Sequence, residues 1–293
     1  MALEYSEKIP EQVPGSLPVY RLVEPDPYPA SSAALAKVAG RIGLQGRAHE
    51  TRTSDEWTMH HEGPFELGHH RESGAVVGRH RERYLRHDER AFELKDEESQ
   101  SIAERFLERT ELIPGDSRLL RVTHLRTAGR ALDGGEVQEQ ALDAGVVFGR
   151  SLERTPVDGP GGFAMVHIDP EGEVSGFRVV WRPVAETIGE VGIRPPDEAS
   201  RALEGLAKRV KGDVRVTKST FGYFEQGISE RQRFLQPAYA MVYVIQDEEV
   251  AIKSAYVVPA GEKVFEPLMG EKRFPIPPQP PRSGAEPRKD RIG

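Results

Sequence analysis

The chain has 293 residues, of which 37% are hydrophobic and 30% are charged, and it contains no cysteine. The missing cysteines exclude a disulfide scaffold, a thiol nucleophile, a thiolate metal site and an iron–sulfur cluster. The 40 Lys and Arg residues against 47 Asp and Glu residues give a net charge of −7, which argues against a general nucleic-acid binder.

The two ends of the chain are rich in proline, which removes an amide donor and fixes φ. Residues 1–29 are therefore expected to form an extended arm with one strand-like piece at 18–23. Residues 269–293 predict a polyproline II tail with a basic end. Because the N-terminus does not resemble a signal peptide and no apolar run approaches the ~20 residues that span a bilayer, a cytoplasmic location is expected.

Between these ends, one order of elements recurs three times. The first unit, residues 30–94, begins with apolar residues at helical spacing that end at Gly43. Short alternating segments separated by Gly and Pro then predict four strands. These strands are expected at 48–53, 57–62, 65–70 and 75–80.

The second unit, residues 95–184, opens with a helix predicted at 97–109. Its clearest feature is a hairpin that pairs 163–168 with 174–181 across Asp169-Pro-Glu-Gly172. Proline presets φ and glycine accepts a positive φ, so this sequence suits a tight turn. Further strands are expected at 118–127, 136–142 and 146–153.

The third unit, residues 185–268, places a helix after Arg194, with Asp197 as its N-cap. Three strands follow it, at 214–220, 238–246 and 250–258. The predicted fold class is therefore α+β, made of three successive units in which a helix precedes an antiparallel meander.

Part of the second unit resembles the propeptides of thermolysin-type metalloproteases. A strand, the turn Thr155-Pro-Val-Asp-Gly159, a second strand and an Asp-x-x-Gly hairpin follow one another as in that family. The third unit, ending near Gln236-Pro-Ala-Tyr-Ala-Met241, is similar to the PepSY-type domains found beside those propeptides. Similar repeats occur in extracytoplasmic proteins that restrain a cell-wall sensor kinase.

This resemblance covers about residues 95–260. It implies cystatin-like curved sheets that grip a helix, an extracytoplasmic setting, and a non-enzymatic role in binding or inhibiting another protein. No His-Glu-x-x-His sequence occurs in the chain, so inhibition of a protease domain in the same chain is excluded.

Seven of the nine histidines lie between residues 49 and 87. Neutral imidazole binds Zn or Cu, so His60, His69 and His80, each on a different predicted strand, are candidate metal ligands. The alternatives are an exposed polar face, or a pH-responsive patch formed with the arginines nearby. Carboxylates interleave with these basic residues, so nucleic acid is not an expected partner, and no other cofactor is predicted.

Motifs of nucleophilic and phosphate chemistry are missing. Gly149-Arg-Ser151 lacks the second glycine of a nucleophile elbow, and the glycines of 159–162 are not followed by the lysine of a phosphate loop. His124, His167 and Tyr223 are candidates to line a pocket on the concave face of a sheet. An acid–base lyase, cyclase or isomerase, or a ligand-binding protein, would use such a pocket.

The favoured function is a non-catalytic module that binds or inhibits another protein through sheet surfaces and extended arms. Tyr239, Met241 and Tyr243 share one face of a predicted strand and are candidates for that contact, with core packing as the alternative. Pro277 and Pro278 in the tail are candidates for a docking peptide. A third hypothesis is a structural protein that assembles with copies of itself.

Overall fold

The chain is mostly β-structure. The computed structural model describes residues 3–25, 33–44, 50–54, 56–84, 91–113, 115–129, 138–210, 212–246 and 251–268. Within these ranges, sixteen strands stand against three helices, α1 (Ala33–Arg41), α2 (Asp96–Thr110) and α3 (Pro196–Ala207). The prediction of an α+β fold built from three helix-plus-meander units, and with it the cystatin-like arrangement, is therefore wrong.

Most strands belong to one mixed sheet of thirteen strands, in the order β16-β15-β13-β9-β8-β10-β11-β6-β5-β4-β3, with β1 beside β13 and β7 beside β8. Their bounds are β1 (Leu3–Tyr5), β3 (Glu50–Thr53), β4 (Trp57–Glu62), β5 (Phe65–His70), β6 (Val76–His80), β7 (Ser117–Gly129), β8 (Gln138–Leu152), β9 (Thr155–Asp158), β10 (Phe163–Ile168), β11 (Val174–Val180), β13 (Asp213–Phe224), β15 (Pro237–Gln246) and β16 (Ala251–Pro259).

Two long-range pairings merge the predicted units into this sheet. β11 pairs with β6, where Phe177 lies opposite Gly78, and β13 lies parallel to β9, where Tyr223 lies opposite Val157. Both pairings join strands from different predicted units. The units therefore have no separate sheets.

A second sheet of three strands closes one end of the molecule. It has the order β12-β2-β14, with β12 at Val184–Gly192, β2 at Ser16–Leu22 and β14 at Phe234–Leu235. The strand-like piece predicted in the N-terminal arm is confirmed as β2, which is packed into the fold through the buried side chains of Val19 and Leu22.

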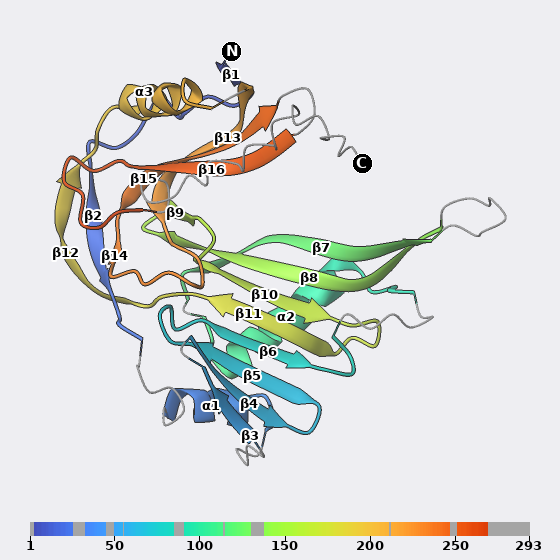
Figure 1. The fold of residues 1–293 in the computed structure, drawn as a ribbon. Helices are drawn as coiled ribbons and strands as arrows, with labels where there is room; N and C mark the ends of the chain where they lie inside the picture. The colour runs from blue at the N-terminus through green and yellow to red at the C-terminus, as the bar shows by residue number, and fades with distance from the viewer. Residues whose placement is uncertain are drawn as a thin grey trace, which may run out of the picture.

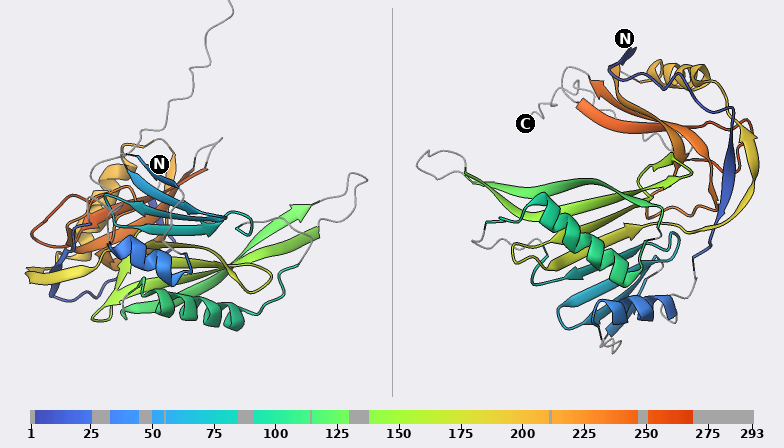
Figure 2. Two further views of the ribbon diagram at one scale, coloured as in Figure 1. Left: turned by 90° about the horizontal axis from the view of Figure 1, so that it is seen from below. Right: turned by 180° about the vertical axis from the view of Figure 1, so that it is seen from behind.

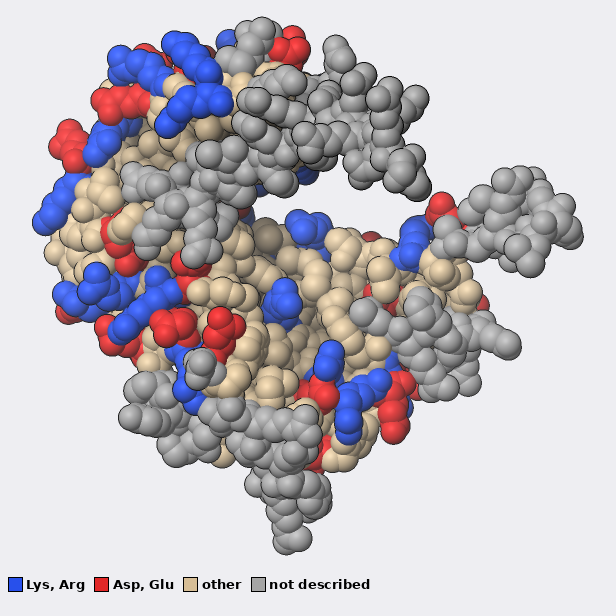
Figure 3. Space-filling view, in the orientation of Figure 1, with Lys and Arg blue, Asp and Glu red and all other residues tan. Residues whose placement is uncertain are grey.

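The main sheet forms an open arc with two lobes (Figure 1). The first lobe comprises β3–β8, β10 and β11 with α1 and α2, and the second comprises β1, β13, β15 and β16 with α3. Between the two lobes, the front of the molecule is hollowed (Figure 3). The second sheet, β12-β2-β14, lies at the closed end of the arc.

The helices pack on the face of the sheet away from this hollow (Figure 2). Helix α2 buries Ala103, Phe106 and Leu107 in a core with Val146 and Val166. Its predicted position is confirmed to within one residue at each end. Helix α3 packs on β13 and β15 in a second core. Because side chains alternate along a strand, the neighbours of these core residues face the hollow.

A buried charged cluster joins the two lobes. The carboxylate of Glu225, at the end of β13, is 3.3 Å from the Arg182 guanidinium and 3.4 Å from that of Arg150 on β8. Arg150 also lies 2.7 Å from a carboxylate oxygen of Asp116. Burial raises the pKa of Glu225, against the effect of the two arginines, and burial lowers the pKa of Arg182. Four distant segments thus meet at one salt-bridge network.

Candidate binding site

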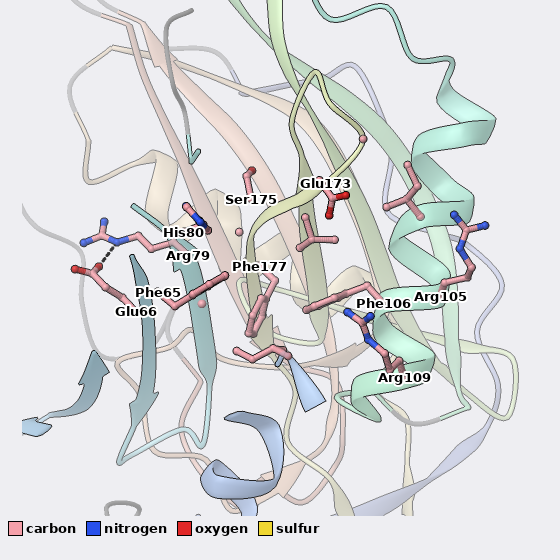
Figure 4. A pocket seen from close by; sticks show the side chains of 16 residues that line it. Phe65, Glu66, Arg79, His80, Arg105, Phe106, Arg109, Glu173, Ser175 and Phe177 are labelled. Carbon is pink, nitrogen blue, oxygen red and sulfur yellow. Dashed lines mark hydrogen bonds and ion pairs between the residues drawn. The ribbon is translucent and has the colours of Figure 1, made fainter. Parts of the chain in front are cut away.

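A pocket of about 450 Å³ opens on the helix-bearing face of the first lobe, between α2 and the strands β5, β6 and β11 (Figure 4). At its base, Gly78 makes room for the ring of Phe177. A Cβ atom at Gly78 would stand only 2.2 Å from the ring of Phe177, so the ring lies directly against the backbone of β6. The Phe177 ring therefore occupies the space over Gly78 at the base of the pocket.

The pocket has an aromatic interior. Phe106 on α2 and Phe177 on β11 lie with their ring centroids 5.1 Å apart, and Phe65 meets His80 edge-on at 4.6 Å. These rings come from four different elements of the first lobe. Phe106 and Phe177 are only 5% and 6% exposed and form the base of the pocket, so a compound that enters meets mainly the partly exposed Phe65 and Ile102.

The rim of the pocket is charged, and its charges are unevenly matched. Glu66, which is largely buried, pairs with Arg79 on the neighbouring strand and also lies 3.7 Å from Arg81. Because Glu66 and Arg79 alternate with Phe65 and His80, their side chains point to the other face of the sheet (Figure 4). On the pocket side, α2 presents Arg105 and Arg109, one helical turn apart and exposed. Neither of these two arginines forms an ion pair with any residue that the structure describes.

The other interactions on the rim do not neutralise the two arginines. The Arg109 guanidinium lies 5.9 Å from the centroid of the Phe106 ring, in the range of a cation–π contact. Glu173 is the other acidic residue of the lining, and it forms no ion pair within the described ranges. Arg105 and Arg109 therefore outweigh Glu173, and the rim carries an excess of positive charge.

The lining contains one hydroxyl group and a pair of arginines that can bind an anion. Its hydroxyl group, on Ser175, donates to the main-chain oxygen of His167 at 3.4 Å rather than to a basic side chain. Arginine presents a planar fork of donors that matches a carboxylate or a phosphate. Beside an aromatic floor, the pair on α2 can hold an anion whose body is apolar.

The three residues predicted to line one pocket are not brought together. His167 lies on the face of β10 away from the helices, with its Nδ1 atom 2.9 Å from the Asp143 carboxylate. His124 lies on the helix side, with its Nε2 atom 2.8 Å from Asp96 on α2. Tyr223 is buried, donates to the main-chain oxygen of Pro18 at 2.9 Å, and has its pKa raised by burial.

The three residues predicted for partner binding on β15 are in the core. Tyr239, Met241 and Tyr243 are at most 1% exposed and pack beneath α3. The Tyr239 hydroxyl donates to the main-chain oxygen of Arg194 at 2.7 Å, and burial raises its pKa to about 12. The core-packing alternative is therefore confirmed for these residues, while Pro277 and Pro278 lie outside the described residues.

The histidines predicted as metal ligands share one face of the sheet but are too far apart to bind one ion. In the register of β5 and β6, His69 lies opposite Val76 and His80 lies opposite Phe65. Phe65 and His69 are four positions apart along β5, so His80 and His69 are separated by about 13 Å along the strand direction. Among the described residues, no group of three or more metal-binding side chains is close enough to hold an ion.

One other histidine of this region gives a pH-dependent prediction. His70 is buried edge-on against Trp57, and burial lowers its pKa. The unfolded chain therefore binds a proton at His70 before the folded chain does, and the free energy of unfolding falls as the pH drops below about 6.5. Uptake of one such proton lowers the free energy of unfolding by at most about 1.4 kcal/mol per pH unit.

Urea denaturation of the native chain and of His70→Phe, at pH 7.5 and at pH 5.5, tests this prediction. We expect a smaller loss of stability on acidification in the variant. Equal losses in the two proteins would show that His70 does not contribute.

Comparisons with known proteins give the fold alone. No protein-family model matches the chain, and no curated protein does. A solved structure described as an uncharacterized protein from Eubacterium rectale is similar, with a TM-score of 0.51 and 12% sequence identity over 89% of each chain. Within the described ranges, no helix has the length and apolar character of a membrane span. The likeness supports the architecture and carries no activity.

Proposed function

We propose that this protein is a non-catalytic binding protein whose pocket takes a small organic acid with an apolar body. The observation that supports it is the juxtaposition of Arg105 and Arg109, both without ion pairs among the described residues, with the aromatic floor around Phe106 and Phe177. The pocket volume of about 450 Å³ falls within the range of small-molecule sites.

Charge should decide which compounds bind. A carboxylate or phosphate on the ligand gains charge-assisted hydrogen bonds from the arginine pair, which are worth about 1.5–3 kcal/mol each. A neutral compound of the same shape gains only the contact with the rings. We therefore expect 2-naphthoate and 2-naphthyl phosphate to bind at least about tenfold more tightly than 2-naphthamide.

Isothermal titration with these three compounds provides the test, together with the double variant Arg105→Glu/Arg109→Glu. The variant should lose the preference for the anions, because the two side chains that supply it are reversed in charge. Arg201→Glu on α3, an exposed helical arginine far from the pocket, serves as the matched control. Equal affinity for the amide and the acids, or an unchanged preference in the double variant, would contradict the proposal.

A further inference from the structure

Strand β7 has one edge that no described strand covers. It is 13 residues long and pairs with β8 along its whole length, and among the described strands β8 is its sole partner. Strands in globular proteins average about 5–6 residues, and exposed edges are generally kept short or covered because they template the addition of another strand. A long open edge of this kind is a candidate site for another chain.

The side chains of β7 are unusually apolar for an exposed strand. Leu119, Leu120 and Leu125 are 37%, 46% and 43% exposed, and they make up half of the exposed large hydrophobic residues in the described ranges. Leu120 extends across its neighbour on β8, since a Cβ atom at Gly149 would stand 2.6 Å from it. Leu119, opposite Phe148, faces the helices, whereas Leu120 and Leu125 lie on the hollow side. The apolar surface on the hollow side gains from being covered.

The same strand is cationic. Arg118 and Arg121 lie opposite Gly149 and Val147, which face away from the helices, so both arginines share the face that borders the hollow. Neither forms an ion pair with a described residue. Arg126, further along, lies 3.7 Å from Glu139 in an exposed pair.

Two irregularities define where another strand can pair. The register of β7 against β8 shifts between Leu119 and Arg121 and again between Leu125 and Arg126. Bulges bend a strand and interrupt the ladder. The regular stretch is therefore the five residues from Arg121 to Leu125.

We infer that the β7 edge binds an extended acidic segment of another protein, which adds to the sheet as a further strand. Main-chain hydrogen bonds along 121–125 would supply the pairing, and side-chain contacts on the hollow side would supply the specificity. Glutamate or aspartate opposite Arg118 and Arg121 forms favourable cross-strand pairs, whereas a second copy of β7 would place its own three arginines against them. Charge therefore favours a different, acidic chain over self-association.

Strand addition makes a prediction that simple charge attraction does not. A fluorescent twelve-residue peptide alternating Glu with Val is the probe, and the same peptide with Lys in place of Glu is its control. We expect the Glu peptide to bind the full-length protein, the Lys peptide to bind at least tenfold more weakly, and bound Glu peptide to slow hydrogen exchange of amides within 121–125.

Variants connect this binding to β7. Arg118→Glu/Arg121→Glu should weaken binding of the Glu peptide at least tenfold, and Arg118→Lys/Arg121→Lys should retain most of it, while Arg201→Glu leaves it unchanged. Circular dichroism checks that each variant is folded. The inference would be overturned if Arg118→Glu/Arg121→Glu bound the Glu peptide as tightly as the native chain does. It would also be overturned if the bound peptide did not slow hydrogen exchange at 121–125. Dimerisation of the free protein with protection at 121–125 would assign the edge to a second copy instead.

Discussion

Replacing Arg182 with alanine is expected to lower the free energy of unfolding by about 3–5 kcal/mol, because it leaves the Glu225 carboxylate buried with part of its compensation removed. The Arg182 side chain is 1% exposed and that of Glu225 is fully buried. Arg182 also donates to the main-chain oxygens of Gln226 and Gly227, each at 2.8 Å. The substitution therefore leaves one charge and several carbonyl groups without a partner.

Equilibrium denaturation in urea measures the effect, and an exposed ion pair provides the control. Arg231 lies 3.2 Å from Glu24, and both side chains are more than half exposed. Arg231→Ala should change stability by no more than about 1 kcal/mol. Combining Arg182→Met with Glu225→Leu should cost less than Arg182→Ala alone, since apolar groups can replace a buried ion pair. A loss below 1 kcal/mol for Arg182→Ala would contradict the importance of the cluster.

The second large effect is expected at Gly161, where alanine should destabilise the fold by about 1–3 kcal/mol. A Cβ atom there would stand 2.3 Å from the main-chain oxygen of Gln226 and 2.9 Å from the Glu225 side chain. The glycine loop before β10 thus lies directly against the charged cluster. Because Gly161 has no side chain, this loop can approach the segment that contains Glu225 and Gln226.

Gly205→Ala is the control, because it is expected to raise the free energy of unfolding instead of lowering it. Gly205 lies within α3, and a Cβ atom there would meet nothing within 4 Å. Alanine is the better helix former, so Gly205→Ala should raise the free energy of unfolding by about 0.5–1 kcal/mol. Thermal denaturation of the two variants beside the native chain would show shifts in opposite directions. Equal shifts would mean that the close approach at Gly161 is not what constrains that position.

Local features of the fold could be predicted from the sequence, because short-range chemistry determines them. The hairpin between β10 and β11 is confirmed: the Asp169 carboxylate accepts from the amides of Glu171 and Glu173, and Gly172 has a φ of 80°. Helix α2 is confirmed for the same reason, since its apolar stripe is visible within fifteen residues. The prediction of three separate units was wrong because the pairing of β6 with β11 leaves no periodic signal in either strand.

Local sequence patterns could not predict the pocket either, although one pattern on α2 indicated its cationic rim. Its lining combines α2, β5, β6 and β11, which only the long-range pairing brings together. On α2, however, Arg105 and Arg109 are adjacent to the stripe that contains Ile102 and Phe106. Arginine beside an apolar helix face that packs on a sheet indicates a cationic rim. The abundant histidines indicated a metal site instead, but His69 and His80 lie too far apart to bind one ion.

The pairing of the N-terminal strands bears on how the chain acquires its fold during synthesis. β1 pairs with β13, with Leu3 opposite Val214, and β2 pairs with β12, with Val19 opposite Gly189. β1 and β2 therefore leave the ribosome well before their partners β13 and β12, which follow much later in the chain. Contacts of such large sequence separation slow folding, and the apolar side chains of β2 remain exposed in the meantime. A nascent chain that has not yet reached β12 is thus open to aggregation through β2 during this interval.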